Sequence, residues 1–314
     1  MSFKRLDNED FVVSAESIAG VAWSTGNPTV TSFSIKTSQK NSVSGKYYIN
    51  AFIDGEEDDP SAPIQFSAAY GNINGYGMTP FDPNVVGYTP TSVVYGQWQN
   101  IVIGDEDTKF KFGDTEKDDF YVINLARNRF KEKILPGSWS ITIGGQSYSD
   151  NSKVATTVSF NEAGRVFPIY PGSAGTPTST TTSRGLFLPD IGAIILDSSL
   201  VGATNSTTYA DSYNPEYLIN AISSFTVNFQ ETISSDFVFV RARNAEYNYS
   251  ENPSFISGST GAVIYNDFIN NPQTYITTVG LYNDTNDLLA VAKLSTPLKK
   301  DFTKEALIRV KLDF

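Results

Sequence analysis

The sequence predicts a mainly β protein built from antiparallel β-sandwich-like domains, with one or two short helices. Short apolar runs recur along the whole chain, separated by clusters of Gly, Pro, Asn and Asp, a pattern typical of strands joined by turns. Aromatic residues make up 13% of the chain, and aromatic and β-branched side chains favour half-buried pleated surfaces. With 314 residues, the chain is long enough for two domains, each with its own core.

The first half is predicted to hold an arm and one β-rich domain. Residues 1–25 form an N-terminal arm or edge strand, and residues 26–172 form the domain. Its first strands are "TVTSFSIKTSQ", "GKYYINAFID" and "IQFSAAYGN", and "SVVYGQWQNIVIGDED" is a later one. The long loop 71–92 between them is rich in Gly and Pro. Because such loops are uncommon in compact domains unless they function or meet a partner, loop 71–92 is a candidate contact surface, as is the acidic loop 104–119.

A helix is predicted from about 118 to 133. Acidic residues stand at its start, and apolar residues follow at a spacing of three and four, although "FYVINL" alone is also compatible with a strand. On this helix Arg127 and Lys131 lie four residues apart and form a basic face. A basic face in an acidic protein favours contact with an acidic partner surface, and a solvated face is the plain alternative.

The second half, residues 173–314, is predicted to be a β-rich C-terminal domain. Its boundary is placed at the low-complexity stretch "GSAGTPTSTTTSRG". A strand pair, "LFLPDIGAIILD", follows, and then a helix, "NPEYLINAISS", capped by Asn214 with Pro215 at its first position. The domain ends in a hairpin over residues 277–302, which has two apolar runs around a polar tip, and in a final strand, "EALIRVKLDF".

The chain contains no Cys and no His, which excludes several kinds of site. Thiolate and imidazole metal sites, Ser-His-Asp and Cys-His chemistry and disulfides all require one of these residues. Loop 104–119 does not match the EF-hand spacing, so we expect a solvated loop there rather than a cation site. The sequence therefore predicts a protein that is not an enzyme and has no cofactor.

The net charge of −11 limits the partners. It disfavours general nucleic-acid binding and attachment to an anionic membrane, both of which use Lys and Arg. No apolar run approaches the roughly 20 residues of a membrane helix, and the N-terminus lacks the apolar region of a signal peptide. We therefore expect protein partners, with no nucleic acid and no membrane insertion.

Several stretches, taken together, resemble one family. They are "FVVSAESIAGVAWSTGNPT", "YGQWQNIVIGD", "DDFYVINLARNRFKEKILPGSWSITI", "AEYNYSENPSFISGS" and the segment from "NNPQTYITTVGLYNDTNDLLAVAKLSTP" to the end. They resemble virion structural proteins of contractile-tailed phages, especially myoviruses of marine cyanobacteria. The resemblance spans nearly the whole chain in the same order and is strongest over residues 245–314.

The closing hairpin resembles a module common in tail, baseplate and tail-fibre proteins. The resemblance implies a tail or baseplate subunit of the virion, made in the host cytoplasm. It also implies assembly in several copies, as a homo-oligomer and with other tail or baseplate proteins. Neck, tube end, baseplate and fibre attachment all stay open as its position.

Interfaces favour aromatic and Arg side chains, which suggests anchors in this sequence. The expected interface residues are Trp23, Tyr76, Phe81, Trp98, Arg127, Lys131, Arg241 and Arg243. The alternative function is a host-surface or carbohydrate-binding module at the tail tip, in which Tyr70, Tyr76, Tyr88 and Trp98 stack on sugars. An enzyme acting on host polysaccharide is a third possibility.

Overall fold

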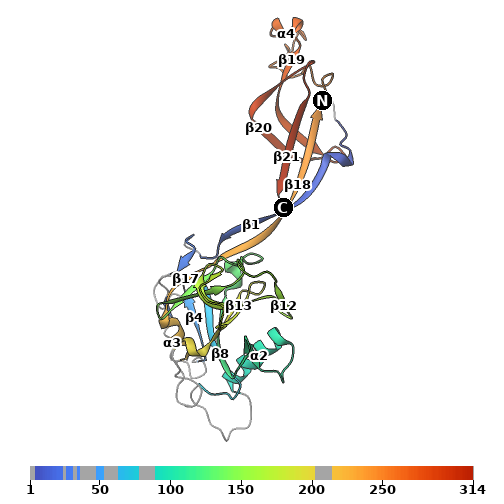
Figure 1. Cartoon of the computed structure of the whole chain (residues 1–314). Coiled ribbons are helices and arrows are strands. Elements are labelled where there is room, and N and C mark those ends of the chain that lie inside the picture. The colour runs from blue at the N-terminus through green and yellow to red at the C-terminus, as the bar shows by residue number, and fades with distance from the viewer. Residues whose placement is uncertain are drawn as a thin grey trace. The chain divides into compact units, whose positions relative to one another are not determined.

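The computed structural model describes residues 4–23, 26–30, 34–35, 47–52, 63–77, 89–201 and 214–313. The chain is mainly β with antiparallel sheets throughout the described residues, as predicted, and two helices in this part of the chain have seven residues or more (Figure 1). The chain divides into two compact units, Met1–Glu16 with Thr232–Phe314, and Ser17–Glu231. The domain boundary was expected between residues 172 and 173. Both residues lie in one strand of the larger unit, β13 (Gly164–Ser173), so the two units differ from the expected domains.

The larger unit is organised around one sheet that is curled into a half-barrel. Its strand order is β2 (Thr29–Val30), β17 (Ile222–Thr226), β10 (Ser140–Ile143), β11 (Gln146–Asp150), β13 (Gly164–Ser173), β15 (Gly185–Leu188), β16 (Ala193–Asp197), β8 (Asp119–Leu125), β5 (Ile64–Asn72), β4 (Tyr48–Phe52) and β3 (Ser34–Ile35). The short strands β12 (Ser159–Asn161) and β14 (Thr176–Pro177) pair with β13, and β6 (Phe110–Phe112) pairs with β7 (Thr115–Lys117).

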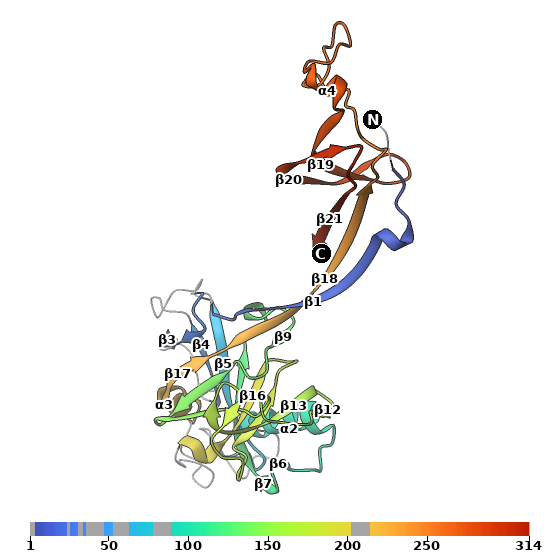
Figure 2. The same cartoon turned by 45° about the horizontal axis from the view of Figure 1, so that its top comes forward.

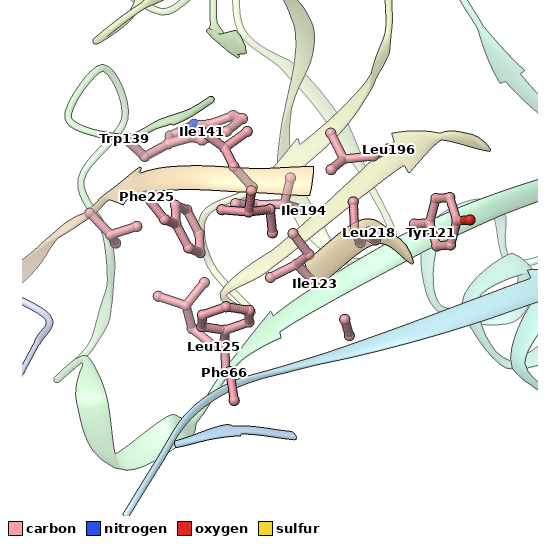
Figure 3. Packing of buried hydrophobic residues seen from close by; sticks show 14 of the residues in the cluster. Phe66, Tyr121, Ile123, Leu125, Trp139, Ile141, Ile194, Leu196, Leu218 and Phe225 are labelled. Carbon is pink, nitrogen blue, oxygen red and sulfur yellow. The ribbon is translucent and has the colours of Figure 1, made fainter. Parts of the chain in front are cut away.

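Alternate residues of the central strands pack into two separate cores. In β8, Tyr121 and Ile123 belong to one core and Phe120 and Val122 to the other, as period-2 geometry requires. The first core also holds the large side chains Phe66, Trp139, Phe225 and Leu218, which lie together in Figure 3. Because both faces of β8 are buried here, residues 120–123 are all apolar and do not alternate with polar residues.

The stretch around Trp98, predicted as a strand, is the helix α2 (Pro90–Ile103), so that prediction was wrong. Thr89 caps the helix by accepting a hydrogen bond from the Ser92 N–H, and Pro90 occupies the first turn. Gly104 ends it with φ +73°. The buried side chains of α2, which include Val94, Tyr95, Trp98 and Val102, fall on one helical face and pack against β5 and its neighbours.

The helix predicted over 118–133 is also wrong. Its first half is β8, and a 3₁₀ turn, η3 (Arg127–Arg129), follows, so Arg127 and Lys131 share no helix face. The strand alternative for "FYVINL" is the correct one, because this segment pairs with β5 and β16 on its two sides. The predicted helix at Asn214 is confirmed as α3 (Asn214–Ala221), which contributes Leu218 to the first core.

The smaller unit contains the end of β18 (Asn228–Ala242), β21 (Ala306–Asp313) and the hairpin of β19 (Gln273–Tyr282) and β20 (Leu288–Asp301). The start of β1 (Phe11–Val21) also belongs to it, and β18 lies between β1 and β21 in their sheet. The short helix α4 (Asp267–Asn270) lies in the segment between β18 and β19 (Figure 2). The predicted closing hairpin and final strand are therefore confirmed.

Candidate assembly surface

The smaller unit has a core of small apolar side chains. Val238 of β18, Val310 of β21 and Val279 of β19 are its buried residues. On the hairpin, Val279 pairs with Ala292, and both face this core, together with Leu281 and Leu294. This side of the hairpin is the inner face.

The opposite side of the hairpin, the outer face, is also apolar but lies exposed. It consists of Gly280, Tyr282, Leu288, Leu289 and Val291. Val291 pairs with Gly280 and is 58% exposed, while Leu289 stands at an irregularity of the ladder and is 68% exposed. A Cβ added to Gly280 would lie 2.9 Å from Cε2 of Tyr282, so the ring of Tyr282 extends over the glycine.

An apolar run on a solvated hairpin is unusual. A strand with one face in water alternates apolar and polar residues, whereas a strand covered on both faces is apolar throughout. Residues 288–292 read "LLAVA", and within the described chain only the inner face is packed. The outer face is therefore suited to being covered by another molecule.

The polar tip beside the outer face is held rigidly by its own side chains. Oδ1 of Asn283 accepts hydrogen bonds from the backbone N–H of Thr285, at 3.1 Å, and of Asp287, at 2.7 Å. Oδ2 of Asp287 accepts a hydrogen bond from the Thr285 hydroxyl at 2.6 Å. Hydrogen bonds from Thr285 and Asn283 lower the pKa of the Asp287 carboxyl below its ordinary value. The tip consequently presents a carboxylate in a fixed position.

A buried lysine anchors the long segment between β18 and β19. The Lys300 ammonium is fully buried and donates to the carbonyl of Asn244 (3.0 Å), the side chain of Asn248 (3.1 Å) and the carbonyl of Asp301 (2.8 Å). These contacts use all three N–H donors of the ammonium. The segment beyond this anchor exposes Tyr249 and Tyr265, which makes it a second surface with aromatic side chains available.

The larger unit contains a buried polar network around Asp119. The hydroxyls of Tyr70 and Ser198 donate to the two carboxylate oxygens of Asp119 at 2.8 and 2.9 Å. Burial raises the pKa of both Asp119 and Tyr70 above their ordinary values, and for Tyr70 the nearby Asp119 adds to the effect. Both oxygens of Asp119 are thus engaged by hydroxyls of the chain itself, so the network holds β5, β8 and η4 (Ser198–Val201) together.

The acids of loop 104–119 also contact their own neighbours. Asp105 accepts from the Thr108 hydroxyl, and Asp118 forms an ion pair with Lys109 at 2.6 Å. Among the residues that the structure describes, no group of three or more Asp and Glu side chains is arranged to hold a metal ion.

The structure places the predicted interface residues apart from one another. Trp23 and Trp98 are 2% and 8% exposed and pack in the cores of the larger unit, which leaves them little surface for a partner. Tyr76 is half-buried, and Phe81 lies outside the described residues. The described ones among them, Trp23, Tyr76 and Trp98, all lie away from the outer face.

The basic residues have different surroundings. Arg127 lies over the ring of Phe130 at 4.7 Å and donates to the carbonyl of Glu132, so its guanidinium is engaged within the chain. Lys131 is exposed in the larger unit. Arg241 and Arg243 are exposed at the end of β18 in the smaller unit.

Sequence reasoning missed the residues of the outer face as contact residues. A signal was present in the unbroken apolar run of residues 288–292, because a hairpin at the surface would alternate. That run alone does not tell which of its faces the chain covers, and only the structure supplies this.

Comparison of the chain with protein-family models, with curated proteins and with solved structures found no match. Within the described residues, no helix is long and apolar enough to cross a membrane.

Proposed function

We propose that this protein is a structural subunit of a phage virion, in the tail or baseplate, that assembles in multiple copies through protein–protein interfaces. The observation that carries the proposal is the hairpin with two apolar faces in the smaller unit. One face forms the unit's core, and the other exposes Leu288, Leu289 and Val291. The resemblance of the same segment to modules of tail and baseplate proteins gives the kind of assembly.

The proposal is tested first in the particle. A cryo-EM reconstruction of the virion, with this chain traced in the density, should place it in the tail or baseplate with the outer face buried. The variant Val291→Asp should fold but be depleted from particles, because a charge would then enter an apolar interface. Val154→Asp, the same substitution at a valine of the larger unit that is 51% exposed, is the matched control. Particles that lack the chain altogether would refute the function.

A second function, binding of a host surface or a carbohydrate, is favoured by the exposed aromatic side chains between β18 and β19. Tyr249 is 71% exposed, and Tyr265 lies 5.4 Å from the ring of Phe268. Amphipathic aromatic rings beside Asn and Ser are common in adaptable recognition surfaces. Binding of host glycans by the isolated protein, lost in Tyr249→Ala but kept in Tyr282→Ala, would favour this function.

A further inference from the structure

The outer face carries opposite charges at its two ends. Lys293 follows Val291 by two residues on β20, so it lies on the same side of the strand, and it is exposed. At the other end, the tip of the hairpin carries Asp284 and Asp287, which are also exposed. The described residues contain no ion pair of Lys293 or of Asp284. The face is thus basic at one end, apolar in the middle and acidic at the other end.

The apolar residues lie midway between the charges. Leu289 and Val291 each stand one residue from position 290, the midpoint of Asp287 and Lys293 along the chain, which is about 3.4 Å at the usual rise of a strand. A surface with this order is complementary to itself when it is turned by 180°. The acid end of one copy then meets the basic end of the other, and the two apolar middles meet each other.

From this order of charges we infer that the outer face binds the outer face of a second copy of this chain, about a two-fold axis near Leu289 and Val291. The inference rests on the proposed function and names one partner for its assembly surface. In the pair, Lys293 of each copy lies against the acidic tip of the other. Both contacts occur at once, because a two-fold interface uses each surface twice.

The charge of the smaller unit permits such a pairing. Residues 1–16 and 232–314 carry 10 Lys and Arg against 13 Asp and Glu, which is a net charge of −3 out of −11 for the whole chain. Two copies of this unit therefore repel each other far less than two copies of the larger unit would. The fixed tip also lowers the entropy lost on association, because the turn of Asn283, Thr285 and Asp287 is already formed.

The test uses two single charge reversals of the full chain, Lys293→Glu and Asp284→Lys. Asp284 is chosen over Asp287 because Asp287 holds the turn. Each variant alone should lose self-association by about tenfold or more, because like charges then face each other twice. An equal mixture of the two variants should regain it, since the glutamate introduced in one variant faces the lysine introduced in the other, and the native pair remains at the second contact. Analytical ultracentrifugation and native mass spectrometry measure the species.

The outcomes separate this inference from the proposed function. If each variant alone loses self-association and the mixture of the two regains it, the result supports a two-fold pairing of outer faces. Self-association of the unmodified chain that is insensitive to both reversals overturns the inference and leaves the proposed function standing. If the unmodified chain stays monomeric at high concentration while Val291→Asp is depleted from particles, a different virion protein covers the outer face. That result likewise refutes the second copy and keeps the proposed function. Circular dichroism confirms that each variant is folded.

Discussion

The buried ammonium of Lys300 gives a sharp test of how the smaller unit is held together. Lys300→Met keeps most of the side-chain length but removes all three hydrogen bonds, so the acceptors on Asn244, Asn248 and Asp301 lose their partner. An acceptor left unpaired in a buried position costs about 1–3 kcal/mol, which applies in full to the buried Asp301 and in part to the half-buried Asn248 and the exposed Asn244. Relief from burying the charge offsets part of the total. We expect the free energy of opening this segment to fall by about 2–3 kcal/mol in Lys300→Met.

The neighbouring residue provides a matched control. Lys299 is exposed and stands opposite Tyr275 in the β19–β20 ladder, with its side chain on the other face of the strand from that of Lys300. Lys299→Met therefore makes the same change in charge and composition without breaking the anchor. A surface substitution of this kind usually changes stability by no more than about 0.5 kcal/mol. The two variants therefore isolate the effect of the buried position.

Hydrogen–deuterium exchange is the suitable assay, because it reports local opening in a chain of two compact units. Peptides that cover residues 244–248 should exchange about thirtyfold faster or more in Lys300→Met, and at the native rate in Lys299→Met. Equal exchange in both variants would show that Lys300 does not hold the segment, and would refute the reasoning.

Two further predictions concern the larger unit. Although burial alone would raise the pKa of Asp190, hydrogen bonds from Arg165 outweigh it and lower the pKa, so the stabilisation is present above the unfolded pKa of about 4 and is lost as the pH falls through the lower folded value. Asp190→Asn should lower the free energy of unfolding at pH 7 by about 2 kcal/mol. Thermal unfolding between pH 2 and 7 should then depend less on pH than it does in the unmodified chain. An unchanged pH profile would contradict the prediction. Phe225→Ala, at a fully buried ring, should cost about 3–5 kcal/mol in denaturant unfolding, whereas Phe160→Ala, 72% exposed, should cost no more than about 0.5 kcal/mol. Similar losses in both would refute the packing shown for Phe225.

The fold class was predictable because most strands pair in hairpins that leave clear turns in the sequence. β15 and β16 meet at Pro189-Asp190, and β19 and β20 at a polar tip, as expected. β8 misled the prediction because it is buried on both faces. Without alternation, its run and the apolar residues beyond it also fit a helical spacing.

For α2, the residues at the two ends of the helix indicate the correct structure, whereas the amino-acid composition of the segment indicates a strand. Val, Tyr and Trp favour strands, but Thr89 and Pro90 start a helix here and Gly104 ends it. The tryptophans show a similar limit for the site. Large aromatic rings serve both interfaces and cores, and whether Trp98 faces a partner or its own chain depends on contacts distant in sequence.

The outer face also bears on the stability of the smaller unit. Its buried core consists of Val238, Val279 and Val310, with partly buried neighbours, which is modest for a unit of this size. A partner that binds only the folded unit stabilises it by mass action. Covering Leu289 and Val291 would therefore do two things at once, joining two molecules and adding to a small core. Under the proposed function, the subunit would gain stability as it assembles, because the second apolar face of the hairpin would then be buried as the first one is.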